Sequence, residues 1–520
     1  MRLLLFLIFL FFSFLFNAQG GFKTRYYLPN ASNNTAKAIF ETSPNNYIAS
    51  GFAVDTLNGS INKAVIMGLN ANGQVQWTKK YGSASLSYLD NNFITRSFYK
   101  QGNNLFYTGC ALENNSKYVG VLIKFNLNGD TLWQKIYRDN TDDVIPQMIT
   151  GSVDGGFLIT GFFQNWVNNS RPCLLIKTDA TGKEVWRRKI SKTTPNVSDG
   201  KAIIQDTLSK KIIIVGYQYL VSNDINDNIL VVDSLGNNPT RNHFNSFGGN
   251  QADIIQTKDK KIVTIGRAIY PQTIGGINLT RSYIAMFDIN APSTPIWKID
   301  DIDKLAVTNG FGCLRELGNG DLLVGGYLDT AELTGPYSNN LTKMYRIDKT
   351  GSVKWKRYYD YKTNDQNKSN FQSMTSLEST FDGGWVAAIQ IINSQPNPFF
   401  FVKYDANGCD STAAHCATLN AVGLPNVGSP NSYRGARLDI VLWPNPANQM
   451  LNVKCEMADI TRLKNMNSEI LITDVVGREV KRSQLEQENK IKTGDLERGI
   501  YLLNISQNGK IVYSCKIVKE

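Results

Sequence analysis

Short apolar runs separated by turns rich in glycine, asparagine and aspartate recur along most of the chain. The stretch 154–190 shows one complete unit. An Asp-Gly-Gly turn beginning at Asp154 precedes an apolar run that ends at Gly161, and a variable loop follows. A second apolar run then leads through the tight turn 179–182 to a third run that carries Trp186. Runs of this length, bounded by such turns, are typical of β-strands joined as hairpins.

The first landmark of the repeat is the spacing between its turn and its glycine. These two features stand seven positions apart in five copies, Pro44/Gly51, Gly102/Gly109, Asp154/Gly161, Ser209/Gly216 and Asp259/Gly266, and further copies surround Gly326 and Ala388. The pattern places this glycine at a strand end, where it suits a close backbone approach or a bend. The fixed spacing therefore predicts seven equivalent units.

The second landmark is a tryptophan four residues after a turn glycine. It occurs at Trp77, Trp133, Trp186 and Trp355. The fourth unit lacks the tryptophan, and the fifth keeps Trp297 but replaces the glycine turn with prolines. A glycine supplies the positive φ of a tight turn, and we expect the large apolar ring to pack between neighbouring sheets.

Four strands per unit and a period of about 50 to 60 residues predict a seven-bladed β-propeller over residues 19–416. The seventh unit has no outer strand after its turn at Asn407-Gly408. The stretch 22–28 resembles the outer strand of the sixth unit, so we expect this N-terminal strand to close the last blade. A closed ring leaves no exposed sheet edge.

The first 18 residues carry one positive charge and then an almost unbroken Leu/Phe/Ile run. This pattern predicts a cleaved signal peptide, with no transmembrane segment in the mature chain. The formal net charge is +11, but Lys and Arg are scattered along predicted strands. We therefore expect no nucleic-acid partner.

Candidate chemistry is sparse. The chain has 2 His and 7 Cys, without a CxxC or Cys/His cluster, so we expect no metal site, no cofactor and no catalytic residue of the histidine-triad type. Cys409 and Cys416 are close enough in sequence to close a small loop, and Cys455 and Cys515 fall on two strands of the C-terminal segment. The segment 139–143 could hold Ca²⁺ through oxygen ligands, but we expect it to be a solvated acidic loop.

Variable loops on a rigid scaffold are where binding usually lies. In a propeller, the loops between the second and third strands of each blade share one face with the connections between blades. Six aromatic residues on or beside these loops are the candidate ligand contacts: Phe162, Trp166, Tyr217, Tyr270, Tyr327 and Tyr337. The alternative is that these rings pack against the loop bases.

Residues 417–437 lose the periodicity and fill with Gly, Pro, Asn and Ser, which indicates a linker. Residues 438–520 have alternating strands and tight turns, sufficient for a small Ig-like sandwich. Three motifs stand out, and their landmark residues are Pro444, Asn445, Pro446, Asp474, Gly477, Gly499, Tyr501, Lys516 and Lys519. In these motifs the segment resembles the type A C-terminal sorting domain of type IX secretion cargo from Bacteroidetes-type bacteria.

The resemblance implies recognition by the secretion machinery and export to the outer cell surface or the medium. The chain is thus expected to be an all-β protein, a propeller followed by a sorting domain. As its function we expect binding of a glycan, a peptide or a partner protein. The alternative is an extracellular hydrolase or lyase acting on polysaccharide at the propeller face.

Overall fold

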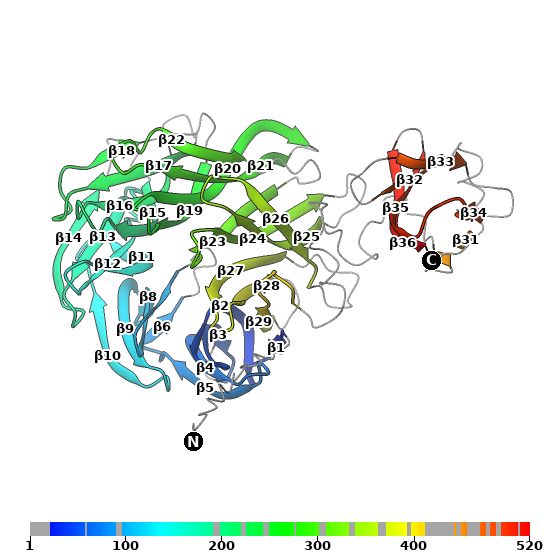
Figure 1. The fold of residues 1–520 in the computed structure, drawn as a ribbon. Helices are drawn as coiled ribbons and strands as arrows, with labels where there is room; N and C mark the ends of the chain where they lie inside the picture. The colour runs from blue at the N-terminus through cyan, green and yellow to red at the C-terminus, as the bar shows by residue number, and fades with distance from the viewer. Residues whose placement is uncertain are drawn as a thin grey trace, which may run out of the picture. The chain divides into compact units, whose positions relative to one another are not determined.

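The computed structural model describes residues 21–57, 60–89, 96–190, 198–219, 225–242, 249–274, 277–300, 308–331, 338–361, 371–392, 397–410, 441–443, 449–454, 469–474, 479–484, 490–507 and 510–519. The elements in these ranges are all β-strands, in agreement with the all-β prediction. The chain divides into two compact units, residues 1–416 and 417–520 (Figure 1). None of the described elements is a helix with the length and apolar character needed to cross a membrane.

As far as the structure describes the first unit, its strands form seven antiparallel sheets, which we number as blades 1 to 7. Blade 1 contains β2 (Ala31–Ser43), β3 (Asn46–Asp55), β4 (Ile61–Leu69) and β5 (Val75–Tyr81). Blade 2 contains β6 (Leu86–Tyr88), β7 (Phe98–Gln101), β8 (Asn104–Glu113), β9 (Lys117–Asn126) and β10 (Thr131–Tyr137). Blade 3 contains β11 (Asp143–Gly151), β12 (Phe157–Gln164), β13 (Cys173–Thr178) and β14 (Glu184–Ile190).

The remaining blades repeat the same order. Blade 4 contains β15 (Ser198–Gln205), β16 (Ile212–Tyr219), β17 (Ile225–Val232) and β18 (Thr240–Asn242). Blade 5 contains β19 (Gly249–Gln256), β20 (Ile262–Ile274), β21 (Ile277–Phe287) and β22 (Pro295–Asp300). Blade 6 contains β23 (Thr308–Glu316), β24 (Leu322–Ala331), β25 (Ser338–Ile347) and β26 (Val353–Tyr359). Blade 7 contains β27 (Phe371–Ser379), β28 (Trp385–Ile392), β29 (Phe399–Tyr404) and β1 (Lys23–Tyr26).

The outermost strand of blade 7 comes from the other end of the sequence. β1 pairs antiparallel with β29, with Lys23 opposite Val402 and Tyr26 opposite Phe399. The first strand of blade 1, β2, in turn contacts β27 and β28 of blade 7. The sheets therefore close into a seven-bladed β-propeller, in which the first strand of each blade is innermost (Figure 1).

The repeating glycine lies inside the second strand of its blade, whereas the sequence pattern placed it at the strand end. β12, for example, continues past Gly161 to Gln164. Opposite this glycine the first strand carries a β-bulge, between Pro146 and Met148 in blade 3, and the same irregularity recurs opposite Gly51, Gly216, Gly266 and Gly326. A Cβ atom on Gly161 would overlap the carbonyl oxygen of Ile145, so the bulge requires a residue without a side chain.

The tryptophans stack blade upon blade. Each ring lies against the turn glycine between the third and fourth strands of the following blade: Trp77 on Gly129, Trp133 on Gly182, Trp186 on Gly236, Trp297 on Gly351 and Trp355 on Gly408. At the closing blade Phe22, just before β1, takes this place against Gly73. These contacts confirm that the rings pack between sheets.

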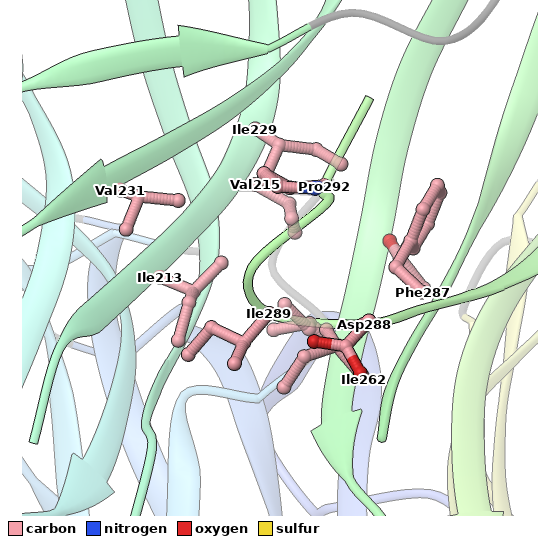
Figure 2. A pocket seen from close by; sticks show the side chains of 11 residues that line it. Ile213, Val215, Ile229, Val231, Ile262, Phe287, Asp288, Ile289 and Pro292 are labelled. Atoms are coloured by element: carbon pink, nitrogen blue, oxygen red, sulfur yellow. The ribbon is translucent and has the colours of Figure 1, made fainter. Parts of the chain in front are cut away.

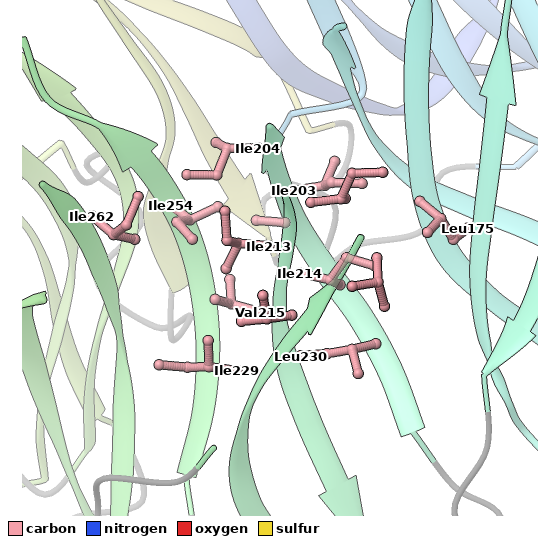
Figure 3. Packing of buried hydrophobic residues seen from close by; sticks show 14 of the residues in the cluster. Leu175, Ile203, Ile204, Ile213, Ile214, Val215, Ile229, Leu230, Ile254 and Ile262 are labelled. Atoms are coloured by element: carbon pink, nitrogen blue, oxygen red, sulfur yellow. The ribbon is translucent and has the colours of Figure 1, made fainter. Parts of the chain in front are cut away.

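Between these contacts the sheets are joined by apolar side chains. The cluster shared by blades 3, 4 and 5 includes Leu175, Ile203, Ile214, Leu230 and Ile254, which project from facing sheets (Figure 3). Each of these five side chains is 0–2% exposed. Burial of this kind stabilises a fold by roughly 25 cal/mol per Å² of apolar surface removed from water.

The second unit contains two antiparallel sheets. One is formed by β30 (Val441–Trp443), β31 (Met450–Lys454) and β34 (Lys490–Lys492). The other is formed by β32 (Glu469–Asp474), β33 (Glu479–Gln484), β35 (Gly499–Gln507) and β36 (Lys510–Lys519). Ile470, Ile472, Ile491 and Leu503 are buried, as the core of an Ig-like sandwich requires.

Candidate functional site

The propeller has two distinct faces. We call the "turn face" the one with the connections from first to second and from third to fourth strands, and the "loop face" the one with the remaining connections. Because adjacent strands are antiparallel, these two sets of connections lie at opposite ends of every blade.

Repeated residues on the turn face serve as scaffold. In blade 3, Lys177 Nζ donates to Asp154 Oδ1 at 2.8 Å and to the carbonyl oxygen of Thr178 at 2.7 Å. In blade 7, Lys403 pairs with Asp382 at 2.7 Å in the same way. The aspartate of the Asp-Gly-Gly turn thus fixes a lysine of the third strand.

Neighbouring blades are also linked at the turn face through the side chain at the end of each innermost strand. Four such side chains accept a hydrogen bond from a backbone N–H in the turn of the preceding blade: Gln205 from Val153, Gln256 from Thr207, Glu316 from Lys258 and Glu41 from Phe381. The turn face is therefore occupied by contacts that hold the ring together.

On the loop face of blade 3, the hairpin between β12 and β13 presents an exposed tryptophan. Trp166 is 69% exposed, yet its indole Nε1 donates to Asp143 Oδ2 at 2.6 Å. Asn165 and Ser170 pair across the base of the loop, and Ser198 N of blade 4 donates to the carbonyl oxygen of Arg171 at 2.8 Å. The ring is consequently held in place while its face remains open to solvent.

The acidic segment 139–143 holds a lysine. Lys189 Nζ lies 2.9 Å from Asp139 Oδ1 and 2.7 Å from Asp142 Oδ2. Burial by itself raises the pKa of Asp139, but the Lys189 ammonium and the backbone N–H groups of Thr141 and Asp142 outweigh it and lower that pKa to about 2. Among the described residues no group of three or more metal-ligating side chains is present.

The other predicted aromatic residues are placed differently from Trp166. Phe162 is 6% exposed and lies under the Arg171 guanidinium, 3.6 Å from its ring centroid. Tyr327 is half-buried, packs on Phe371 of blade 7 and accepts a hydrogen bond from Arg267 at 3.2 Å. Both follow the repeating glycine directly, where the side chain packs at the loop base.

The side chains of the other three predicted aromatic residues lie outside the described part of the structure. Tyr217 and Tyr270 lie in strands β16 and β20, and their side chains fall outside the described part. Tyr337 lies outside the described residues altogether.

A cluster of cations beside this hairpin was not singled out from the sequence. Arg171 forms an ion pair with the fully buried Asp199: Nη2 donates to Oδ2 at 2.8 Å, and Nε lies 2.7 Å from Oδ1. Lys201 approaches the same carboxylate at 3.5 Å. Burial lowers the pKa of Lys201, Asp199 opposes that shift, and the nearby positive charges of Arg171 and Arg267 add to it. We call Arg171, Lys201 and Arg267 the basic cluster.

The sequence signal for this cluster lies in the repeat itself. Lys201 is the bulge residue of blade 4, since the register shifts between Gly200 and Ala202. Arg267 directly follows Gly266, a position held by aromatic residues in blades 1, 3, 4 and 6. Arg267 is thus a departure from the repeat.

A second group of charges joins the innermost strands. Arg96 of blade 2 donates to Asp253 of blade 5 at 2.9 Å and to the carbonyl oxygen of Leu314 of blade 6 at 3.1 Å. Arg315 of blade 6 lies 3.7 Å from Asp253 and pairs with Glu378 of blade 7. Both carboxylates are therefore engaged by arginines, and the network ties four blades together across the ring.

One pocket is lined almost entirely by core side chains. It lies between blades 4 and 5, where Ile213, Val215, Ile229 and Ile262 face Ile289 and Pro292 (Figure 2). Here the outer strand of blade 4 has Thr240 four residues after its turn glycine instead of a tryptophan, and in the turn of blade 5 Ala291, followed by Pro292, takes the place of the glycine. The pocket is therefore the space that a tryptophan fills between other neighbouring blades, and it is not a polar binding site.

The thiols offer no reactive centre in the described part of the propeller. Cys110, Cys173 and Cys313 are buried, and burial raises the pKa of each to about 12. Cys409 is disulfide-bonded, and Cys416 and Cys455 lie outside the described residues.

The sorting motifs are partly described. Asp474 ends β32 opposite Tyr501, and the Tyr501 hydroxyl donates to the carbonyl oxygen of Glu497 at 2.9 Å. Gly499 begins β35 opposite Lys519, and Lys516 lies opposite Leu502. Pro444, Asn445, Pro446 and Gly477 lie outside the described residues.

The fold and the C-terminal segment define the class: a β-propeller protein that carries a sorting domain for export. Residues 441–520 match the family described as "Secretion system C-terminal sorting domain", the type IX sorting domain. This match indicates export to the cell surface or secretion. A search of curated proteins finds no match to the chain.

Solved structures with detectable similarity include the β-propeller domain of the Trilobed protease from Pyrococcus furiosus, at 11% identity and a TM-score of 0.41, covering 74% of this chain and 99% of that one. Drosophila Semaphorin 1a, extracellular domains 1–2, is 8% identical with a TM-score of 0.40, and the match covers 74% of this chain and 87% of that one. A DUF4221 family member from Bacteroides vulgatus is 12% identical with a TM-score of 0.34, covering 64% of this chain and 98% of that one.

Proposed function

We propose that this protein is a carbohydrate-binding propeller displayed or released outside the cell, with its ligand site on the loop face of blade 3. The supporting observation is Trp166, whose ring is 69% exposed while its N–H group is anchored to Asp143. An aromatic face is electron-rich, so the polarised C–H groups of a sugar ring pack against it favourably. A fixed ring loses little conformational freedom when the sugar binds.

The domain organisation fits this role. We propose a signal peptide at residues 1–18, the propeller at 19–416, a linker at 417–437 and the sorting domain at 438–520. In this arrangement the sorting domain directs export, and the propeller carries the ligand site.

The alternative, a hydrolase or lyase, needs a carboxylate that is free to act on the substrate. Asp253 and Glu378 at the centre of the ring are both bound to arginines, which supports a structural role for them. Release of reducing ends from a polysaccharide by the purified protein, lost in Glu378→Gln, would favour the enzyme.

A glycan array probed with the purified full-length protein tests the proposal. We expect Trp166→Ala to weaken glycan binding by about 30-fold or more, since an anchoring tryptophan contributes roughly 2 kcal/mol or more. The matched control is Phe381→Ala, because Phe381 is a comparably exposed ring, 65%, on the turn face. Absence of glycan binding by the wild type, or equal binding by Trp166→Ala, would refute the proposal.

A further inference from the structure

The basic cluster has more positive than negative charge within the described residues. Arg171 and Lys201 both contact the carboxylate of Asp199, which compensates one charge. Arg267 is hydrogen-bonded to the neutral hydroxyl of Tyr327. Three cations thus lie close to one buried carboxylate among the described residues, and such a concentration of positive charge attracts an anionic ligand.

The cluster is held rigidly and partly removed from water. Asp199 is fully buried, and the side chains of Arg171 and Lys201 are 27% and 10% exposed. The Arg171 guanidinium also stacks on Phe162. A neighbouring guanidinium, Arg241, is fixed through Nη1 to Ser198 Oγ at 3.1 Å, whereas its buried Nη2 has no hydrogen-bond partner among the described residues. An unpartnered buried donor costs free energy, and an acceptor from a ligand or water would satisfy it.

One member of the cluster, Arg171, belongs to the same hairpin as Trp166, whereas Lys201 and Arg267 come from blades 4 and 5. Arg171 follows that loop directly, and the bridge between Asn165 and Ser170 brings the loop's two sides together. A ligand ring stacked on Trp166 therefore lies at the end of the blade where the cations lie. This continuity extends the proposed carbohydrate site, on which the present inference rests.

We propose that the ligand is an acidic polysaccharide, and that Arg171, Lys201 and Arg267 with Arg241 bind its carboxylate or sulfate groups. Guanidinium groups recognise planar carboxylates and sulfates through paired N–H donors, and a low-exposure setting strengthens such charge-assisted bonds. A neutral sugar would not gain this stabilisation, because its hydroxyl groups carry no negative charge to pair with the cations.

Paired titrations with the full-length protein separate charge from sugar backbone. Polygalacturonate is compared with its methyl ester for the carboxylate, and dextran sulfate with dextran for the sulfate. We expect one charged member to bind at least tenfold more tightly than its neutral partner, with affinity falling as NaCl increases. Lys201→Gln and Arg267→Gln should each weaken this binding about tenfold, as expected for a charged hydrogen bond.

Arg188→Gln is the matched control, because this arginine of blade 3 stacks on Trp186 away from the cluster. Unchanged thermal unfolding shows that each variant is folded. Equal binding of charged and neutral partners, with loss in Trp166→Ala, overturns the acidic ligand and retains the carbohydrate site. Absence of binding to every polysaccharide overturns both. Binding of duplex DNA as tightly as dextran sulfate, unaffected by Trp166→Ala, also overturns the inference.

Discussion

The stacking of each tryptophan on the next blade's turn glycine gives a sharp test of how the ring is held. In blade 3, Gly182 has φ of 77°, and a Cβ atom there would lie 2.7 Å from the ring of Trp133. Gly155 of the same blade has φ of 87° in a similar turn, but a Cβ atom there meets nothing within 4 Å. The two glycines share the backbone requirement and differ in the ring contact.

The magnitudes follow from these two terms. Alanine at a left-handed position costs roughly 1–2 kcal/mol, so Gly155→Ala should lower the free energy of unfolding by about that amount. Gly182→Ala adds the displacement of a packed indole, which is an overpacking cost of roughly 1–3 kcal/mol. The difference between the two variants therefore measures the contact between blades 2 and 3.

Urea unfolding of the full-length protein, followed by far-UV circular dichroism, measures both changes. In a Trp133→Ala background the extra cost of Gly182→Ala should disappear, because the ring that it displaces is gone. Equal destabilisation by Gly155→Ala and Gly182→Ala in the wild type would refute the stacking argument.

Three further predictions concern charge, thiols and closure of the ring. Because the folded pKa of Asp139 is depressed to about 2, its pair with Lys189 stabilises the fold above the unfolded pKa and is lost as pH falls from about 4 toward 2. In urea unfolding, Asp139→Asn should therefore be less stable than wild type at pH 6, by roughly 1–2 kcal/mol, and equal to it near pH 2; a gap that persists at pH 2 contradicts this. Cys110, Cys173 and Cys313, with pKa raised by burial to about 12, should escape alkylation at pH 8 until the protein unfolds, as peptide mass spectrometry can check; rapid labelling would show that the blades open. Replacing residues 23–26 by Gly-Ser repeats should expose the buried strand Phe399–Tyr404 as a sheet edge and cause aggregation in size-exclusion chromatography, whereas a monomer of wild-type stability would show that β1 is dispensable.

Much of the scaffold follows from the sequence because its determinants are local and repeated. Four tryptophans each lie four residues after a turn glycine, and seven copies of the unit reveal the period. The position of Gly161 within β12 did not follow from the sequence, because the bulge that it faces belongs to a different strand. The sequence of the glycine-containing strand alone does not show that a bulge of the neighbouring strand packs closely against it.

The candidate site was only partly predictable for the same reason. Trp166 follows from its place in a variable loop, but Phe162, four residues earlier in the chain, is buried beneath Arg171. The basic cluster joins residues from blades 3, 4 and 5, which are far apart in sequence. These basic residues come together only when the three blades pack against one another in the folded ring.

The central claim is that the loop face of blade 3 carries the ligand site and the turn face does not. Hydrogen–deuterium exchange of the full-length protein tests it, with and without saturating polygalacturonate or dextran sulfate, whichever binds more tightly. We predict slower exchange at backbone amides of residues 162–171 and no change at the turn 179–183. Protection of that turn, with residues 162–171 unaffected, would contradict the account.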